Sequence, residues 1–196
     1  MYTRLIFLSC LIVFQGFAAG PFGFEYGMTK EQVIAAVGQN AVKKIQSDVL
    51  TLTTAPKPHP AFETYQVMIS PKLGLVKILA IGNTIGTNRY GNEIQTAFIE
   101  TQEALVNNYG TPGVSYDFLR SGSIWAEHED WMMGLAKGER VLATFWTPTN
   151  SPNHITSIEL EANALSMEKG YLDLGYEFEG FPEYAQSKKT DAGKVF

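Results

Sequence analysis

Hydrophobic residues recur at helical spacing in two segments of the chain, and the first segment is marked at both ends. Thr29 and Gln32 have the spacing of a capping box, in which a hydroxyl and an amide pair with backbone groups of the first helical turn. Apolar residues follow from Val33 to Val37, and Gly38 is the residue type that commonly ends a helix. The pattern predicts a short amphipathic helix over residues 30–37.

The second segment spans about residues 92–109 and is the longest helical pattern in the sequence. Its apolar and small residues fall at intervals of three and four, while glutamates and glutamines occupy the other side. Gly110 and Pro112 end the pattern in the order expected beyond a helix C-terminus. The inward positions are Ile94, Phe98, Thr101, Leu105 and Asn108. We expect this helix to lie on a sheet with one side in water.

Alternating apolar and polar residues predict strands between and after these helices. The clearest segments are 49–54, 62–69, 75–81, 140–147, 154–162 and 171–178. Residues 114–119 are compatible with a further short strand, and residues 127–137 with either a helix or a strand. After Gly180 the sequence is polar, which predicts a loose tail over residues 181–196.

Runs of neighbouring strands with segregated helices predict an α+β fold, with a mostly antiparallel sheet and helices packed on one face. We expect one domain over residues 20–180. Its segments 20–90 and 91–180 each have the pattern of a helix followed by strands. A structural duplication is compatible with this order, although no internal sequence repeat supports it.

The first 19 residues have the pattern of a secretory signal peptide. Arg4 precedes an apolar run over residues 5–14, and the small residues Ala18 and Ala19 offer a cleavage site. The run is too short to cross a bilayer. Cys10 faintly matches a lipoprotein signal, but too few apolar residues precede it, and its removal would leave a mature chain without disulfides or thiolates. We expect an exported protein that is periplasmic or secreted.

The charge balance argues against a nucleic-acid partner. The chain has 15 basic and 20 acidic residues, a net charge of −5, and its basic residues do not cluster. After residue 19, no apolar stretch approaches the length needed to cross a membrane. We therefore expect a soluble mature chain.

The segment 27–33, Gly-Met-Thr-Lys-Glu-Gln-Val, followed by Gly38, resembles the signature of the SmpA/OmlA family. These are small bacterial outer-membrane lipoproteins that help to assemble β-barrel proteins, and β-lactamase-inhibitor-like domains are similar in layout. The resemblance implies helices on an antiparallel sheet and another envelope protein as partner. The chain departs from the family in its greater length and in lacking a cysteine close before the motif.

The densest cluster of polar and aromatic residues lies in the segment 125–131, Trp-Ala-Glu-His-Glu-Asp-Trp. The candidate binding residues are Trp125, Glu127, His128, Glu129, Asp130 and Trp131. His128 with carboxylates could hold a divalent cation. Zinc sites draw three or four ligands, however, and His59 and His154 lie in unrelated segments, so we expect no metal and no cofactor. The ordinary alternative is a wet helix end beside core aromatics.

Other catalytic patterns are weaker. The chain has no Gly-x-Ser-x-Gly elbow and no phosphate-binding loop. Carboxylates alternate on two predicted strands, at Glu159 and Glu161 and at Asp173 and Glu177, as a half-solvated sheet requires. Five aromatic residues are compatible with a binding surface or with core packing: Trp125, Trp131, Trp146, Tyr171 and Tyr176.

The sequence therefore favours an exported, non-catalytic binding or envelope-assembly protein. Two alternatives remain open. One is a metal-dependent or other hydrolase that uses residues 127–130, and the other is an inhibitor-like module that covers another protein's active site.

Overall fold

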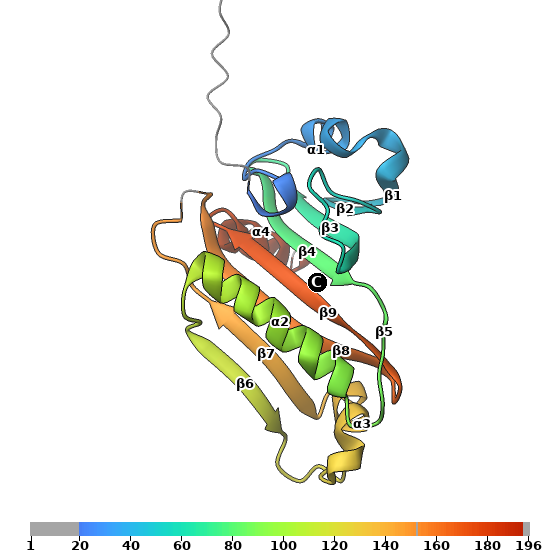
Figure 1. The fold of residues 1–196 in the computed structure, drawn as a ribbon. Helices are drawn as coiled ribbons and strands as arrows, with labels where there is room; N and C mark the ends of the chain where they lie inside the picture. The colour runs from blue at the N-terminus through green and yellow to red at the C-terminus, as the bar shows by residue number, and fades with distance from the viewer. Residues whose placement is uncertain (1–19, 152, 194–196) are drawn as a thin grey trace, which may run out of the picture.

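The computed structural model describes residues 20–151 and 153–193, so the predicted signal segment 1–19 lies outside the described residues. In the described part, the strands form one antiparallel sheet in the order β1-β2-β3-β4-β9-β8-β7-β6, and the short strand β5 pairs with β9 (Figure 1). The predicted α+β class with an antiparallel sheet is confirmed.

The chain order divides the sheet into two halves with matching element order. The first half consists of α1 (Lys30–Val37), β1 (Val42–Gln46), β2 (Val49–Leu52), β3 (Phe62–Ser70) and β4 (Gly74–Gly82). After β5 (Ile85–Gly86), the second half consists of α2 (Asn92–Tyr109), β6 (Val114–Leu119), β7 (Arg140–Trp146), β8 (Ile155–Ser166) and β9 (Lys169–Phe178). The two halves meet at their last strands, because β4 pairs antiparallel with β9. Strands β1 and β6 therefore form the two edges of the sheet.

The predicted capping box of α1 is present. The Thr29 hydroxyl accepts a hydrogen bond from the Gln32 backbone N–H at 3.3 Å, and the Gln32 side-chain oxygen accepts one from the Thr29 N–H at 2.8 Å. Val33 is fully buried, and Gly38 ends the helix at a φ of 85°. The motif that resembles the SmpA/OmlA signature thus has a structural role in this chain.

The core lies between α1 and α2 on one side and the inward face of the sheet on the other. One row of paired residues crosses the sheet on that face: Leu52, Tyr65, Ala80, Leu174, Leu160 and Thr144, all buried. Val33 of α1 joins Ile94, Phe98 and Leu105 of α2 in the same hydrophobic cluster. Burying one such side chain stabilises the folded chain by about 1.5–3 kcal/mol. These buried residues therefore fix both helices to one face of the sheet.

The prediction of a loose tail over residues 181–196 is wrong for the described residues 181–193. A helix, α4 (Phe181–Gly193), occupies this region, and Tyr184 within it is only 8% exposed. Lys188 of α4 also forms an ion pair with Asp48 in the β1–β2 turn. The sequence is polar because most of this helix faces water, and its packing depends on few residues.

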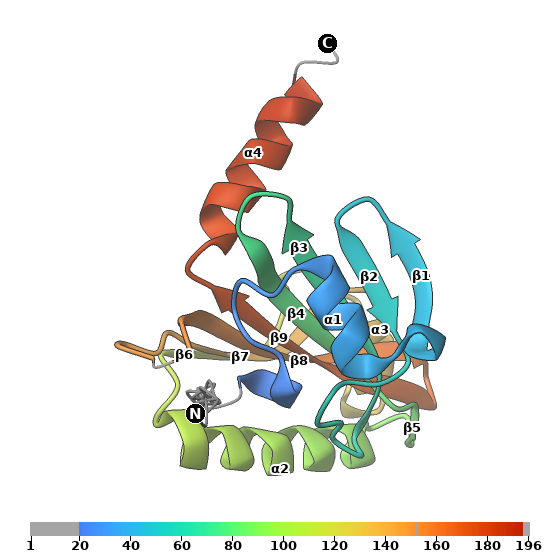
Figure 2. The same cartoon turned by 90° about the horizontal axis from the view of Figure 1, so that it is seen from above.

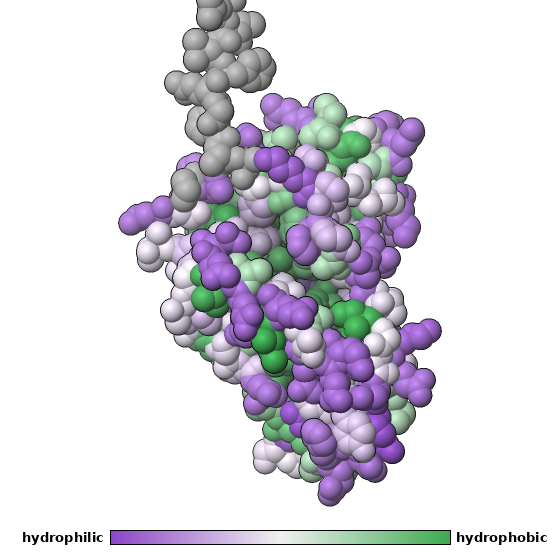
Figure 3. All heavy atoms as spheres, in the orientation of Figure 1, coloured by the Kyte–Doolittle hydropathy of each residue, from purple (hydrophilic) through white to green (hydrophobic). Residues whose placement is uncertain are grey.

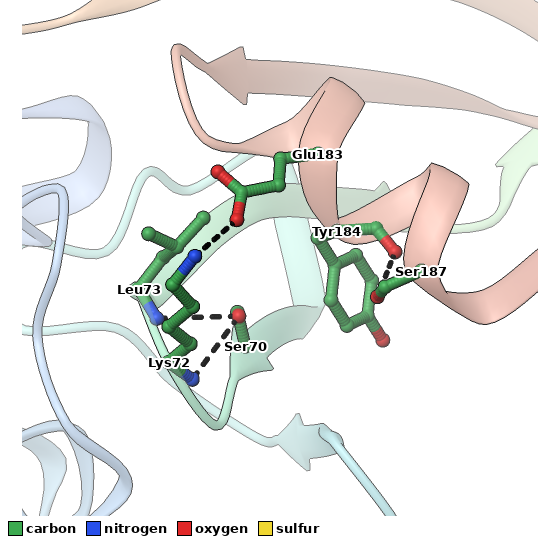
Figure 4. A network of polar contacts seen from close by, with 6 residues as sticks. All are labelled: Ser70, Lys72, Leu73, Glu183, Tyr184 and Ser187. Carbon is green, nitrogen blue, oxygen red and sulfur yellow. Dashed lines mark hydrogen bonds and ion pairs between the residues drawn. The ribbon is translucent and has the colours of Figure 1, made fainter. Parts of the chain in front are cut away.

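Helix α4 lies on the side of the sheet away from α2, as Figure 2 shows. It packs beside the β3–β4 hairpin, where the Lys72 ammonium donates a hydrogen bond to the Glu183 carboxylate at 2.7 Å (Figure 4). The Ser70 hydroxyl holds the same hairpin turn by accepting hydrogen bonds from the backbone N–H groups of Lys72 and Leu73. The two main helices thus share one face, as the sequence predicts, and α4 adds a helix on the other.

Two other elements differ from the sequence prediction. The helix expected over residues 127–137 is shorter, with a 3-10 turn, η3 (His128–Asp130), before α3 (Trp131–Ala136). Strand β1 has no counterpart in the prediction because its residues are mostly exposed. The remaining 3-10 turns are η1 (Pro21–Gly23) and η2 (Gln39–Ala41). No helix in the described part of the chain is both long and apolar enough to span a membrane.

Candidate functional site

The polar cluster predicted as a binding site forms a turn that docks onto the start of α2. Arg89 donates a hydrogen bond to the Glu129 carbonyl at 3.0 Å and lies 3.4 Å from the Glu129 carboxylate and 3.9 Å from that of Asp130. The His128 ring packs on the Tyr90 ring, with centroids 5.1 Å apart. These contacts hold the segment between β6 and α3 in place.

The other members of this cluster divide between the surface and the core. Glu127 is exposed and Trp125 is half-buried, whereas Trp131 is only 5% exposed and packs against Gly91. Among the described residues, no group of three or more His, Cys, Asp or Glu side chains is placed to hold a metal ion. The contacts of His128, Glu129, Asp130 and Trp131 therefore position the segment that leads into α3, and the proposed binding role of the six residues stays a prediction.

A more extended surface lies on the sheet face away from α2, beyond the part that α4 covers beside the β3–β4 hairpin, and we call it the open face. Strand register places one row of paired residues across it: Thr51, Gln66, Leu79, Gly175, Glu159, Phe145 and Val114. The neighbouring row contains Thr64, Ile81, Asp173, Glu161, Ala143 and Tyr116. Over the second half of the sheet, the apolar end of these rows lies at β6 and β7, and the acidic part lies at β8 and β9.

The apolar end is an aromatic strip formed by Val114, Tyr116 and Phe118 of β6 with Phe145 of β7. The three β6 residues are 45%, 45% and 43% exposed. The Tyr116 ring meets the rings of Phe118 and Phe145 edge-on, each with centroids 6.0 Å apart. Edge-on aromatic contacts favour a fixed arrangement, so the strip is an ordered apolar surface on the outermost strand.

Next to the strip lies an acidic cluster of Glu159, Glu161 and Asp173. Glu161 and Asp173 are direct cross-strand partners, and Glu159 pairs with Gly175, which leaves space beside its carboxylate. Like charges in direct opposition destabilise a sheet. The cluster is therefore an unfavourable feature of the chain on its own.

The pKa values of the acidic cluster reflect this crowding. Partial burial, followed by the charges of Glu161 and Glu159, raises the pKa of Asp173 to about 6. Burial and the charge of Glu159 also raise the pKa of Glu161. Asp173 Oδ2 accepts a hydrogen bond from the Asn163 amide at 3.1 Å, whereas the buried Oδ1 atom has no hydrogen-bond partner among the described residues. A cation placed over this cluster would reduce the repulsion.

Strand β6 also leaves one side of its backbone without a neighbouring strand. It pairs regularly with β7 from Val114 to Leu119, and no described strand lies on its other side. All of its residues but Leu119 are exposed. Its one charged side chain, Asp117, pairs with Arg140 at 3.4 Å. An exposed apolar edge strand can accept a further strand from another chain.

The sequence predicts only part of this surface. In the sequence, the carboxylates of this surface are visible only as acids that alternate along two separate strands. The aromatic residues that the sequence suggested for a binding surface are mostly core residues, since Trp131, Trp146 and Tyr176 are at most 5% exposed. Only the strand register places Tyr116 and Phe118 beside the acids. The sequence feature that points to the aromatic strip is the alternation of polar and apolar residues over 114–119, which places Tyr116 and Phe118 on one face of the strand.

Comparisons of the chain with protein-family models, with curated proteins and with solved structures gave no match.

Proposed function

We propose that this chain is an exported, non-catalytic protein-binding domain that docks a partner polypeptide on β6 and the adjoining open face. Export is inferred from the sequence of residues 1–19. The observation that carries the docking proposal is the exposed aromatic strip on an unpaired edge strand.

Edge strands of soluble proteins are normally protected by lysines, bulges or covering segments. Strand β6 has a regular register and no lysine, and three of its six residues are both large and apolar and exposed. A partner segment in extended conformation would satisfy the free backbone groups of β6 and bury the aromatic strip. Aromatic residues also dominate the binding energy of many protein interfaces.

The acidic cluster indicates the chemistry of the partner. Glu159, Glu161 and Asp173 lie on the strands next to the aromatic strip, on the same face. A partner lysine or arginine beside an apolar residue complements this arrangement. A second copy of the chain would bring a second acidic cluster close to the first, so charge disfavours self-association here.

An inhibitor-like role is a special case of this proposal, in which the partner is an enzyme. The hydrolase alternative finds less support, because His128 stacks on Tyr90 and the neighbouring Glu129 and Asp130 carboxylates face Arg89.

The proposal is tested by site-specific photo-crosslinking of the full chain in the cells that produce it. A photoreactive phenylalanine analogue replaces Phe118 in one variant and Ile45 in the control. Ile45 is an apolar residue of the other edge strand and is exposed to a similar extent, 46% against 43%. We expect a discrete protein adduct from position 118 that is absent from position 45.

The same experiment tests whether the acidic cluster contributes to partner binding. Combined Glu161→Gln and Asp173→Asn substitutions should reduce the adduct yield, as should high salt. Equal adducts from positions 118 and 45, or none from position 118, would contradict the proposal. An adduct with twice the mass of the chain would assign the surface to a second copy and overturn the proposed partner.

A further inference from the structure

A groove lies on the other face of the sheet, at the junction between the two halves. It has a volume of about 390 Å³, within the range of about 300–1,000 Å³ that is usual for small-molecule sites. One wall is α2, and the other consists of η1, the β2–β3 loop and the end of β4. Figure 3 shows the surface hollowed between α2 and the first half, with hydrophobic residues in the hollow.

The floor of the groove is apolar. It is formed by Leu172, Leu174 and Tyr176 of β9, with Phe62 beside them. The side of α2 that lines the groove carries small residues at Ala97, Thr101 and Ala104, beside the larger Leu105. Because small side chains occupy a helix face where larger residues would close the gap, the groove stays open.

The rim of the groove carries polar side chains and one carboxylate. Glu100 of α2 makes no hydrogen bond or ion pair with a described residue, and it is the only Asp, Glu, Lys or Arg among the described residues that line the groove. The side-chain amides of Asn83 and Asn108 donate to the carbonyls of Pro60 and Ala104, at 2.6 and 3.0 Å. Their amide oxygens remain free to accept hydrogen bonds, while each amide keeps a second N–H and His59, whose Nδ1 accepts from the Ala61 N–H, keeps its other ring nitrogen.

Phe22 closes one end of this apolar wall. Its ring packs edge-on against Phe62, Tyr65 and Tyr176, with centroids 5.6, 5.0 and 5.9 Å apart. Its backbone has a φ of 55°, a conformation that is uncommon for a residue other than glycine. The aromatic contacts hold the ring over the groove despite this conformation.

From an apolar floor, small residues on α2 and a rim whose one carboxylate, that of Glu100, has no ion pair with a described residue, we infer that the groove binds a small amphipathic amine. The apolar body of the ligand lies on β9 beneath Phe22, and its ammonium group donates hydrogen bonds to Glu100 and the asparagine oxygens. This site is separate from the open face, because it lies on the α2 side of the sheet, and it does not rest on the proposed docking function.

The inference is tested by calorimetric titration of the full chain with three ligands that share one alkyl chain: decylammonium, decanol and decanoate, each below its micelle concentration. Decylammonium should bind about tenfold more tightly than decanoate, since Glu100 attracts one head group and repels the other. Decanol should lie between them.

Two variants and two controls connect this binding to the groove. Ala104→Leu fills the groove and should weaken the binding of all three ligands by more than about tenfold, whereas Asn107→Leu adds the same side chain on α2 outside the groove lining. Glu100→Gln should reduce the preference for decylammonium by about fivefold, and Glu103→Gln should leave it unchanged. All four positions are exposed, so thermal unfolding should show that each variant is folded.

Several results would overturn the inference. Absence of saturable binding by all three ligands would exclude an alkyl site in this groove. Tighter binding of decanoate than of decylammonium would contradict the role given to the Glu100 carboxylate. Unchanged binding after Ala104→Leu would place any ligand elsewhere on the chain.

Discussion

The two halves of the sheet share an order of elements but end in very different edge strands. Strand β1 has the sequence Val-Lys-Lys-Ile-Gln, and its register with β2 shifts between Val42 and Lys44. Strand β6 has the sequence Val-Ser-Tyr-Asp-Phe-Leu and pairs with β7 without a shift. Lysines and bulges are features that prevent an edge from pairing with another chain. The contrast indicates that one edge is protected and the other is available.

The halves differ also in the segments beyond their first helix. In the first half, α1 leads through η2 directly to β1. In the second half, the segment between β6 and β7 contains η3 and α3, and α3 packs against β8 and β7. The polar cluster with Glu127 and His128 belongs to this addition. The second half thus has both the added segment and the available edge.

The largest expected effect comes from breaking the joint between the added segment and α2. Gly91 has a φ of 74°, and a Cβ atom there would lie 2.2 Å from the Trp131 ring. We expect Gly91→Ala to cost about 3 kcal/mol of unfolding free energy, from backbone strain and overpacking together. Gly138→Ala is the matched control, with a φ of 66° and no atom within 4 Å of the added Cβ, and should cost about 1 kcal/mol. Equal costs in urea unfolding would show that the Trp131 contact is unimportant.

A smaller effect, on binding and not on folding, is expected from placing a charge on each edge. Phe118→Lys should weaken partner binding by about 2 kcal/mol, because it puts an ammonium group into the aromatic strip. Ile45→Lys should leave binding unchanged. Both positions are well exposed, so each variant should retain its stability within about 0.5 kcal/mol. Loss of binding in both variants, measured with the crosslinked partner, would remove the distinction between the edges.

The acidic cluster should affect stability in a pH-dependent way. Folding raises the pKa of Asp173 to about 6, so the folded chain holds this proton more tightly than the unfolded chain. Stability should therefore fall as pH rises from the unfolded value of about 3.9 to about 6, and the cost should be complete at pH 7.

Asp173→Asn removes this cost. Because Asp173 is partly solvated, the gain at pH 7 should be only about 1 kcal/mol, or about 2–4 °C in Tm. The gain should vanish near pH 4. Thermal unfolding of both proteins across this range measures it, and a destabilised variant at pH 7 would contradict the proposed repulsion among the acids.

The smallest effect is expected at the protected edge. Lys43→Thr combined with Lys44→Val removes the charges from β1, whose side chains here are exposed. The variant should show weak, concentration-dependent self-association that the parent chain lacks. Light scattering after size exclusion detects it, and a strictly monomeric variant would mean that the bulge alone protects β1.

Sequence patterns predicted the elements whose residues face a core on one side. Capping at Thr29 and the stripe from Ile94 to Leu105 defined the two main helices, because helical spacing and burial coincide there. The C-terminal helix was missed, since Tyr184 is the only described residue of α4 that is buried below a tenth of its surface. Strand β1 was missed for the same reason.

The candidate site was less accessible to prediction because it depends on register between strands far apart in the chain. Tyr116 and Glu161 are separated by 45 positions, yet each pairs with Ala143 of β7 on the same face. Nothing in residues 114–119 alone indicates that acids lie beside them. The composition of residues 125–131 predicted a binding site there. The contacts of this cluster with Arg89 and Tyr90 are long-range, so its structural role could not be predicted from the local sequence.

Hydrogen–deuterium exchange of the full chain, with and without the partner recovered by crosslinking, tests the central claim most directly. We predict that the partner slows exchange in peptides covering residues 114–119 and leaves residues 42–46 unchanged, because only β6 gains a neighbouring strand. Protection confined to residues 42–46 or to residues 125–131, with none over 114–119, would contradict the account.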